Sequence, residues 1–372
     1  MQYRNAQIII DLDAIKQNIT MLKTQLPKET AIFAVVKADG YGHGSIEVAR
    51  AALGAGASAL CVAILEEAVT LREAGIEAPI LVMGYTDPAY SGEAERYDIQ
   101  LTAFQLDWLE EAKHHINDHL NLHIKLDTGM GRLGLRTVED VAMFLEAVDN
   151  PLFNVVGAFT HFAKADAADD TYYHYQAAHY RELIQPIKQR YGQSILYHTG
   201  NSAASMQFPS DMYDAVRFGI GMYGLYPSIY LRDHPPFELK PALSLTTQLV
   251  HVKQLPQGEK ISYGLTYETE TDEWIGTIPV GYGDGIQRRF QNFDVLIEGK
   301  RMPIVGRVCM DQCMVKLDKP YLVGTTVTFI GKEKEERITL EEVAEHLGTI
   351  NYEVSCLLTS RLPRLYRHEG KS

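Results

Sequence analysis

The sequence of 372 residues predicts an α/β protein, namely a (β/α)8 TIM barrel followed by a mainly antiparallel β domain. Two observations predict this fold class. From about residue 12 to residue 230, eight short apolar runs alternate with segments of helical periodicity. After Pro235-Pro236 the chain changes to short runs rich in Val, Ile and Thr, separated by turns that contain glycine. A doubly wound open sheet remains the alternative for the first part, because periodicity does not separate the two arrangements.

The elements of the barrel follow in chain order. Leu12, Ile15, Ile19 and Leu22 recur at intervals of three and four residues, which predicts a first helix with one apolar face and Asp11 as its cap. The eight strand-like runs cover residues 32–36, 59–64, 79–83, 101–104, 123–126, 155–160, 195–198 and 214–218. A closed barrel of this type needs about eight parallel strands in about 250 residues.

The second domain is predicted from runs at 294–297, 303–308 and 325–330, which have the composition of strands. Thr339 and Glu342 stand three residues apart before an apolar run, and this spacing is typical of a capping box that opens a helix. We expect residues 1–238 to form the barrel and 239–372 the second domain. Residues 1–11, with the apolar run 8–10, are expected to pack with the second domain.

Composition excludes several classes of function. The net charge is −13 and the basic residues form no blocks, which argues against nucleic acid or an anionic membrane as partner. The four cysteines match no metal or disulfide spacing, and no apolar run approaches the length of a membrane span. We therefore expect a cytoplasmic protein that binds no metal.

The run A-V-V-K-A-D-G-Y-G-H-G at 34–44 is the most informative segment. An apolar strand ends on Lys37 and a glycine-rich turn follows at once. A lysine at the mouth of a buried strand is partly desolvated, which favours a neutral, nucleophilic amine suited to a Schiff base with a carbonyl cofactor. The alternative is a lysine that extends its charge to solvent beside an ordinary turn.

Other ionisable residues stand at the ends of later predicted strands, where barrel enzymes build their active sites. Lys125 ends the fifth strand, His161 the sixth, His198 the seventh and Arg217 the eighth. A single histidine at a strand end is more often structural, but five such groups on one rim, with Lys37, indicate a site.

The segments that follow the last two strands suggest an anion site. They read G-N-S-A-A at 200–204 and F-G-I-G at 218–221, and they offer a hydroxyl and backbone N–H groups. The loops after strands seven and eight commonly hold phosphate in barrels, although each segment alone also fits a helix cap or a tight turn. Together with Lys37, they predict a cofactor that carries both an aldehyde and a phosphate, which is pyridoxal 5'-phosphate.

The ordered set of motifs makes the resemblance specific. The chain contains, in order, V-K-A-D-G-Y-G-H-G, K-L-D-T-G-M-G-R-L-G, F-T-H-F, G-N-S-A-A, V-R-F-G-I-G-M-Y-G, S-Y-G, V-G-Y-G-D-G, R-V-C-M-D-Q and I-N-Y-E-V. This series resembles that of the alanine racemases, from Asp11 to Arg364. The resemblance implies a homodimer with shared active sites that interconverts L- and D-alanine and supplies D-alanine for peptidoglycan.

The resemblance also implies two catalytic residues. Lys37 would hold the cofactor as an aldimine and then act as one acid/base. Tyr263, in Ser262-Tyr263-Gly264, would be the opposing acid/base and would come from the dimer mate. Racemisation requires a proton to leave one face of a planar carbanion and another to reach the opposite face. Without the resemblance, a strand tyrosine with its ring in the core would be the simpler interpretation.

Further roles follow from the resemblance. Arg217 would face the ring nitrogen of the cofactor, His198 would orient Arg217, and His161 would belong to the same network. Arg132 would contact the phenolic oxygen of the cofactor and the substrate carboxylate, and Met310 would lie on the substrate side. The remaining implied residues are the phosphate ligands Tyr41, Ser202, Gly219, Ile220 and Tyr352, the substrate corridor of Tyr282, Arg288 and Arg307, and Asp311, which would support Tyr263.

Lys125 resembles a lysine that is often carbamylated in this family. Lys125 and Arg132 would repel each other as two cations, and a carbamate would convert this repulsion into attraction.

Two different functions are alternatives to the racemase. A metal-dependent barrel hydrolase also uses a carbamylated lysine and histidines at strand ends, but the first strand here offers Lys37 in place of an H-x-H pair. A non-catalytic pyridoxal-phosphate-binding protein is the other alternative. Single-domain carriers of that kind lack a second domain with a tyrosine such as Tyr263.

Overall fold

The computed structural model describes residues 3–368, which divide into two compact units. The barrel unit comprises residues 14–40 and 45–240, and the second unit comprises residues 3–13, 41–44 and 241–368. The bounds of 1–238 and 239–372 expected from the sequence stay a prediction.

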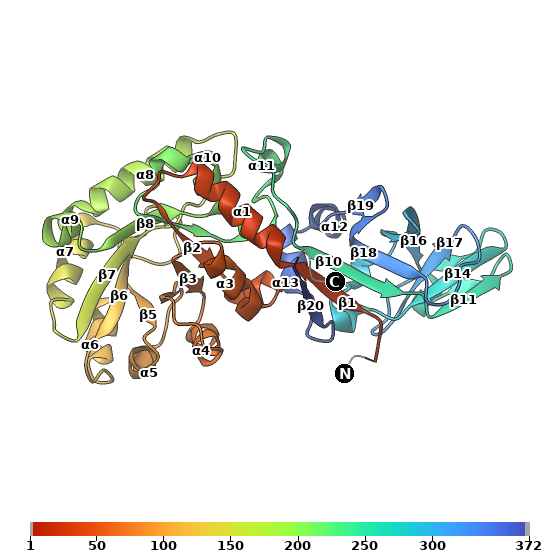
Figure 1. Ribbon diagram of the computed structural model, residues 1–372, viewed down its shortest axis with the longest axis horizontal. Helices are drawn as coiled ribbons and strands as arrows, with labels where there is room; N and C mark the ends of the chain where they lie inside the picture. The colour runs from red at the N-terminus through yellow and green to blue at the C-terminus, as the bar shows by residue number, and fades with distance from the viewer. Residues whose placement is uncertain (1–2, 369–372) are drawn as a thin grey trace. The chain divides into compact units, whose positions relative to one another are not determined.

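Eight parallel strands close into a barrel within the first unit (Figure 1). Strand β2 pairs with β3 on one side and with β9 on the other, which closes the ring. The predicted (β/α)8 barrel is therefore confirmed and the open-sheet alternative is wrong. The strands are β2 (Ala31–Val35), β3 (Ala59–Val62), β4 (Ile80–Val82), β5 (Gln100–Ala103), β6 (Leu120–Lys125), β7 (Phe153–Phe159), β8 (Leu196–Gly200) and β9 (Ala215–Phe218).

Helices surround these strands on the outside of the barrel (Figure 1). The carboxylate of Asp11 accepts the backbone N–H of Asp13 at 3.0 Å, which confirms Asp11 as the cap of the first helix. The helices are α1 (Leu12–Gln25), α3 (Ser45–Gly54), α4 (Leu65–Glu73), α5 (Ser91–Arg96), α6 (Leu106–Ala112), α7 (Val138–Ala147), α8 (Thr171–Leu183), α9 (Gln185–Tyr191), α10 (Ser202–Gln207) and α11 (Ile229–Asp233). The short segment α2 (Lys37–Tyr41) is a left-handed turn that follows β2.

The second unit is built on a mostly antiparallel sheet with the strand order β11-β14-β17-β16-β15-β18-β10-β1-β20, and β19 pairs with β18. A separate two-stranded ribbon joins β12 and β13. The strands are β1 (Gln7–Asp11), β10 (Leu243–Gln248), β11 (His251–Leu255), β12 (Lys260–Ile261), β13 (Tyr267–Glu268), β14 (Glu273–Ile278), β15 (Asp294–Ile297), β16 (Lys300–Val305), β17 (Cys313–Leu317), β18 (Thr326–Glu333), β19 (Glu336–Ile338) and β20 (Arg364–Arg367).

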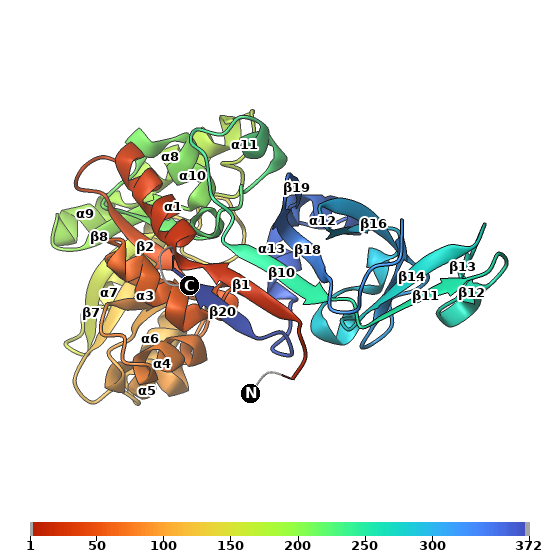
Figure 2. The same cartoon turned by 45° about the vertical axis from the view of Figure 1, so that its right-hand side comes forward.

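The N-terminal strand belongs to this second sheet. Strand β1 lies between β10, to which it is antiparallel, and β20, to which it is parallel (Figure 2). Ile8 and Ile10 are fully buried there, which explains the apolar run at the start of the chain. Residues 41–44 also belong to this unit, because the carbonyl of Gly42 accepts the Nε–H of Arg364 at 3.1 Å.

Helices α12 (Leu340–Leu347) and α13 (Asn351–Cys356) complete the second unit. Thr339 caps α12, since its hydroxyl accepts the backbone N–H of Glu342 at 3.1 Å. The reciprocal half of the predicted capping box does not form, because the carboxylate of Glu342 binds Arg301 instead. The expected box is therefore only half right.

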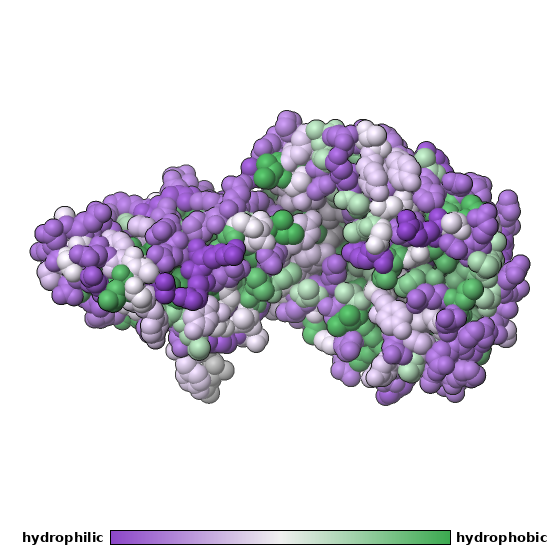
Figure 3. Space-filling view, turned by 180° about the vertical axis from the view of Figure 1, so that it is seen from behind, coloured by the Kyte–Doolittle hydropathy of each residue, from purple (hydrophilic) through white to green (hydrophobic). Residues whose placement is uncertain are grey.

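Hydrophilic residues cover most of the visible face of each unit, with apolar side chains scattered among them (Figure 3). Within residues 3–368, no helix is both long enough and apolar enough to cross a membrane.

Candidate active site

Arg217, in the middle of β9, is the largest fully buried side chain of the barrel unit, with an exposed fraction of 2%. Its Nη1 donates to the Nδ1 of His198 at 2.8 Å and to the carbonyl of the same residue at 3.1 Å. Its Nη2 faces the carbonyls of Thr160 at 2.6 Å and Thr199 at 3.0 Å, and the Nδ1 of His161 at 3.3 Å. The ends of β7 and β8 thus supply acceptors for all four Nη hydrogens.

The fifth hydrogen of the guanidinium, on Nε, has a different environment. This nitrogen is buried and has no hydrogen-bond partner in residues 3–368. An unsatisfied buried donor costs about 1–3 kcal/mol, and native structures rarely keep one without a reason. The Nε–H of Arg217 is therefore a donor suited to an acceptor that the chain itself does not supply.

Burial and the charge of this arginine together lower the pKa of the neighbouring histidines. Burial lowers the pKa of Arg217 to about 10, so the guanidinium remains a cation at neutral pH. Burial, and then the charge of Arg217, holds the pKa of both His161 and His198 well below 6.5. The same two causes lower the pKa of His123 to about 3. All three histidines are therefore neutral at neutral pH.

A chain of hydrogen bonds leads away from Arg217 through the barrel interior. The Nδ1 of His198 accepts from Arg217, so its other nitrogen carries the hydrogen and donates to the Nδ1 of His123 at 2.9 Å. The Nε2–H of His123 then donates to the side-chain oxygen of Gln100 at 2.8 Å. Because Arg217 can only donate, the nitrogen that carries the hydrogen is assigned first for His198 and then for His123.

His123 and Gln100 were not predicted as site residues from the sequence. The available signal was the alternation of side chains along a strand, which places His123 on the same face of β6 as Lys125. A second sign was Gly157 in the neighbouring strand β7. A Cβ built on Gly157 would come within 2.2 Å of the Nδ1 of His123, so glycine makes room for the imidazole.

Lys125 ends β6 inside the barrel and is 5% exposed. Its Nζ donates to the carbonyl of Leu126 at 2.6 Å. Burial and the charges of Arg217 and Arg132 lower the pKa of Lys125 to about 7, against an opposing effect of Asp127. About half of the Lys125 amines are therefore neutral near pH 7.

The loop that follows β6 is held by Asp127 and presents Arg132. The Oδ1 of Asp127 accepts the backbone N–H groups of Gly129 at 3.1 Å and Gly131 at 3.0 Å. The side chain of Arg132 is exposed, and its charge acts on both Lys125 and His161.

Lys37 follows β2 at the same end of the barrel as the residues above. It is half-buried, and its charge also contributes to the lowered pKa of His161. The barrel unit thus brings together six residues that the sequence predicts as site residues: Lys37, Lys125, Arg132, His161, His198 and Arg217.

Ser202 connects the segments that follow β8 and β9. Its hydroxyl oxygen accepts the backbone N–H groups of Gly219 at 3.0 Å and Gly221 at 3.3 Å. Because the oxygen acts as the acceptor in both contacts, its own hydrogen stays available for an anion. Ile220 directly follows Gly219 in the same buried turn.

The other predicted site residues lie in the second unit. The rings of Tyr41 and Tyr352 are 6.1 Å apart between centroids. Tyr263 is 72% exposed, in a loop where Ser262 and Leu265 have positive φ angles of 67° and 52°. The Ser262 hydroxyl fixes this loop by donating to the carbonyl of Arg307 at 2.5 Å.

The loop that contains Met310 joins the Tyr282 loop through the backbone. The N–H of Tyr282 donates to the carbonyl of Cys309 at 3.0 Å, and the N–H of Gly283 donates to that of Met310 at 2.9 Å. Tyr282 and Met310 therefore lie on adjoining loops. Arg288 is exposed, and no hydrogen bond in the described chain connects it to them.

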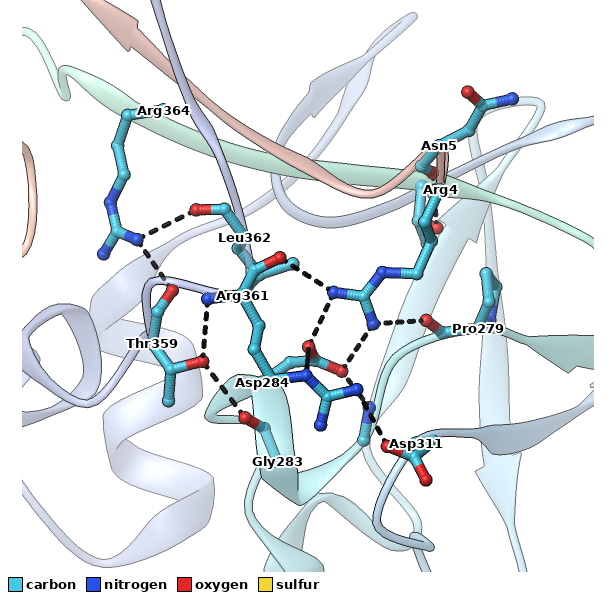
Figure 4. Close-up of polar contacts among 12 residues, drawn as sticks. Arg4, Asn5, Pro279, Gly283, Asp284, Asp311, Thr359, Arg361, Leu362 and Arg364 are labelled. Atoms are coloured by element: carbon cyan, nitrogen blue, oxygen red, sulfur yellow. Dashed lines mark hydrogen bonds and ion pairs between the residues drawn. The ribbon is translucent and has the colours of Figure 1, made fainter. Parts of the chain in front are cut away.

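A buried carboxylate, Asp284, anchors this region (Figure 4). Asp284 is fully buried and accepts two hydrogen bonds from Arg4, at 2.7 and 3.0 Å. Arg361 lies 3.4 Å from Asp284 and donates to Asp311 at 2.8 Å. Figure 4 shows Arg361 between the two carboxylates. Within residues 3–368, no hydrogen bond joins Asp311 to Tyr263, so the expected support of Tyr263 by Asp311 is not seen in the single chain.

Comparison with known proteins identifies the family. Residues 10–227 match the family model described as "Alanine racemase, N-terminal domain", and residues 242–366 match "Alanine racemase, C-terminal domain". The chain belongs to the alanine racemase family. The family recognised from the sequence motifs is confirmed, and the chain is a racemase, an isomerase of the pyridoxal-phosphate-dependent class.

Individual relatives extend over almost the whole chain. The alanine racemase of Halalkalibacterium halodurans is 49% identical over 99% of this chain and 97% of its own length. The alanine racemase of Geobacillus stearothermophilus is 49% identical over 99% of this chain and 95% of its own length. A crystal structure of alanine racemase from Bacillus anthracis with bound L-Ala-P has a TM-score of 0.97, at 44% identity, and covers 100% of this chain and 97% of that chain.

Family membership decides against the metal-dependent hydrolase considered from the sequence. In the described part of the chain, no group of three or more His, Cys, Asp or Glu side chains could hold a metal ion.

The space that Gly157 leaves for His123 can be tested by Gly157→Ala. We expect the free energy of unfolding to fall by about 1–3 kcal/mol, because the added methyl group must displace the imidazole. Chemical denaturation measures this loss. In a His123→Ala background, Gly157→Ala should lower the free energy of unfolding by at least about 1 kcal/mol less than in the original protein. Strictly additive losses would contradict the contact between residue 157 and the imidazole of His123.

The buried ion pairs of Asp284 can be tested by Asp284→Asn. We expect a loss of about 3 kcal/mol in the free energy of unfolding, because Arg4 and Arg361 lose a shared buried counterion. Asp311→Asn is the matched control, since it removes an exposed partner of Arg361 and should cost less than 1 kcal/mol. If urea denaturation gave equal losses of unfolding free energy for Asp284→Asn and Asp311→Asn, the buried ion pairs of Asp284 would contribute no additional stability.

Proposed function

We propose that this protein interconverts L-alanine and D-alanine with pyridoxal 5'-phosphate, by a two-base mechanism in which Lys37 and Tyr263 of the dimer mate move the protons. The D-alanine that it forms would be used for peptidoglycan. One observation carries the proposal besides family membership. The buried cation Arg217 has acceptors for its four Nη hydrogens, whereas its buried Nε–H has none in the described chain.

The residues present fit this cofactor. When bound, pyridoxal phosphate supplies an aldehyde that reacts with amines and a conjugated ring that withdraws electron density from the substrate. Lys37 offers the amine, the Nε–H of Arg217 suits the ring nitrogen, and Arg132 and His161 flank the site. Ser202, Gly219, Ile220, Tyr41 and Tyr352 would hold the phosphate, with the hydroxyl hydrogen of Ser202 as one donor.

Arg217 would limit the reaction to racemisation. A guanidinium with a pKa of about 10 donates a hydrogen bond to a ring nitrogen but does not give up its proton at neutral pH. The ring nitrogen would stay unprotonated and withdraw electrons weakly. Arg217 would in this way favour the return of a proton to the substrate Cα over transamination.

Two proton carriers are needed on opposite faces of the substrate Cα, since racemisation inverts that carbon. The amine of Lys37 would serve one face, and the phenol hydroxyl of Tyr263 from the other subunit would serve the other. Leu265, in the same loop as Tyr263, is 60% exposed, and Met310, which follows the Cys309 that contacts Ser262, is 53% exposed. Such a surface around a phenol supports a homodimer in which this loop contributes to the partner's site.

Substrate choice would depend on a small pocket. Arg132 would hold the substrate carboxylate as a charge-assisted pair, and Met310 with Tyr352 would leave room for a methyl group. Tyr282, Arg288 and Arg307 would line the corridor, and Asp311 would act through Arg361. One methylene changes affinity by only about 1–3 kcal/mol, so we expect slow turnover of serine.

We further propose that Lys125 is carbamylated. A neutral amine attacks the carbon of CO2, forms an N–C bond and loses one proton to solvent, which leaves a carbamate anion. The pKa of Lys125, lowered to about 7, provides the neutral amine. The anion would pair with Arg132 and fix its guanidinium for the substrate.

The proposed reaction is tested by incubating the purified protein with pyridoxal phosphate and either enantiomer of alanine, and following the enantiomer ratio. We expect both to converge on a racemic mixture. Lys37→Ala should abolish conversion, and Tyr263→Phe should lower kcat by about 10²–10⁴-fold, the usual effect of removing an acid/base. Tyr90→Phe, which removes another exposed phenol hydroxyl, is the control. Full activity of Tyr263→Phe would contradict the two-base mechanism.

The carbamate is tested with ¹³C-labelled bicarbonate and NMR at a fixed concentration of dissolved CO2. A lysine with a pKa of about 7 is about 10% neutral at pH 6 and about 90% neutral at pH 8. The carbamate signal should therefore increase as the pH rises from 6 to 8, and Lys125→Met should remove it. An electron-density map with unmodified Lys125 in contact with Arg132 would reject the modification.

A further inference from the structure

The turn that follows Lys37 has a left-handed backbone. Ala38, Asp39 and Gly40 have φ angles of 52°, 50° and 61°, and ψ angles of 51°, 49° and 44°. Glycine adopts this conformation freely, but each L-residue with a Cβ in it costs energy. Consecutive strained residues of this kind persist only where surrounding contacts hold them, and they concentrate at functional sites.

Two of the contacts that hold the turn are local. The N–H of Gly40 donates to the carbonyl of Val36 at 2.9 Å. The carboxylate of Asp39 accepts the N–H of Ser45, at the start of α3, at 2.9 Å. Neither of them acts on the peptide group directly after Lys37.

The contact on that peptide comes from the next βα unit. The N–H of Ala38 donates to the Oε1 of Glu67 at 2.6 Å. The other oxygen, Oε2, accepts the N–H groups of Ala63 at 2.8 Å and Ile64 at 3.4 Å. The half-buried carboxylate of Glu67, in the first turn of α4, is therefore fixed by the end of β3 and is not free to follow the turn.

We infer that Glu67 is a positioning residue for Lys37, because its carboxylate holds the Lys37–Ala38 peptide plane and the strained turn behind it. The N–H of Ala38 belongs to the same peptide as the carbonyl of Lys37, so holding it fixes ψ of Lys37 and the direction of its side chain. This inference rests on the proposed role of Lys37 as the amine that binds the cofactor.

A role in capping α4 alone is the competing explanation, and two variants separate it from positioning. Glu67→Gln keeps a single acceptor oxygen, so it cannot serve Ala38 and Ala63 equally well. Adding Ala38→Gly relieves the strain of the left-handed turn, because glycine takes positive φ without steric cost. That second change cannot restore a helix cap, so recovery would identify the turn as the target of Glu67.

The matched control is Glu66→Gln. Glu66 precedes Glu67 in the first turn of α4, is exposed, and has no side-chain hydrogen bond in the described chain. The two substitutions remove the same charge from the same helix end. Only Glu67→Gln should affect the turn.

The experiment uses the full-length protein freed of cofactor and makes two measurements. Hydrogen–deuterium exchange of the peptide containing Ala38 should be at least tenfold faster in Glu67→Gln and unchanged in Glu66→Gln. The rate at which added pyridoxal phosphate forms a borohydride-trapped adduct on Lys37 should fall at least tenfold in Glu67→Gln. Ala38→Gly should restore that rate to within threefold of the original protein.

The outcomes are distinguishable. Unchanged exchange at Ala38, or an unchanged adduct rate, would overturn the inference. Slow adduct formation that Ala38→Gly does not rescue would assign Glu67 to helix capping and also overturn it. If the unaltered protein forms no adduct on Lys37, the proposed function fails, and exchange at Ala38 still decides whether Glu67 holds the turn.

If Glu67→Gln does not fold, the comparison is made between the double variant Glu67→Gln/Ala38→Gly and the single variant Ala38→Gly. At least tenfold faster exchange at residue 38 in the former variant, with equal adduct rates in the two, supports the inference. Equal exchange, or a tenfold lower adduct rate in the former variant, contradicts it.

Discussion

The organisation of the barrel interior depends on one buried cation. Arg217 is almost fully enclosed, and no carboxylate in residues 3–368 pairs with it. Burying an unpaired ion is costly, so the charge must be stabilised by dipoles directed at it. Carbonyl groups at the ends of β7 and β8 and the unprotonated nitrogens of two histidines provide those dipoles. The sequence of each of these strand ends therefore has to suit one guanidinium.

Burial and the same charge together determine which neighbours can ionise. Burial disfavours the charged form of each side chain, and the cation of Arg217 disfavours a second positive charge nearby, so His161, His198 and His123 remain neutral and about half of the Lys125 amines are neutral near pH 7. The site therefore combines one fixed positive charge, several neutral donors and acceptors, and amines that can be nucleophilic. This combination suits a reaction in which protons move at the substrate while the protein interior keeps a constant charge.

Much of this arrangement could be predicted from the sequence, and the remainder depended on details that motifs do not carry. Eight apolar runs predicted the closed barrel, and the strand-end positions of His161, His198 and Arg217 predicted that they meet. The link from His198 through His123 to Gln100 was missed, because it depends on the stagger of strands β5, β6 and β8. The left-handed turn after Lys37 was missed as well, since Ala38 and Asp39 do not favour it and the N–H of Ala38 must donate a hydrogen bond to Glu67, 29 residues away.

The central claim, that a permanently charged Arg217 imposes a single hydrogen-bond direction on neutral histidines, is tested most directly by ¹⁵N NMR of histidine-labelled protein at neutral pH. The account predicts that His198 and His123 are both neutral and carry their hydrogen on Nε2, and that neither titrates down to pH 5. An imidazolium at either residue, or a hydrogen on the Nδ1 of His198, would contradict it.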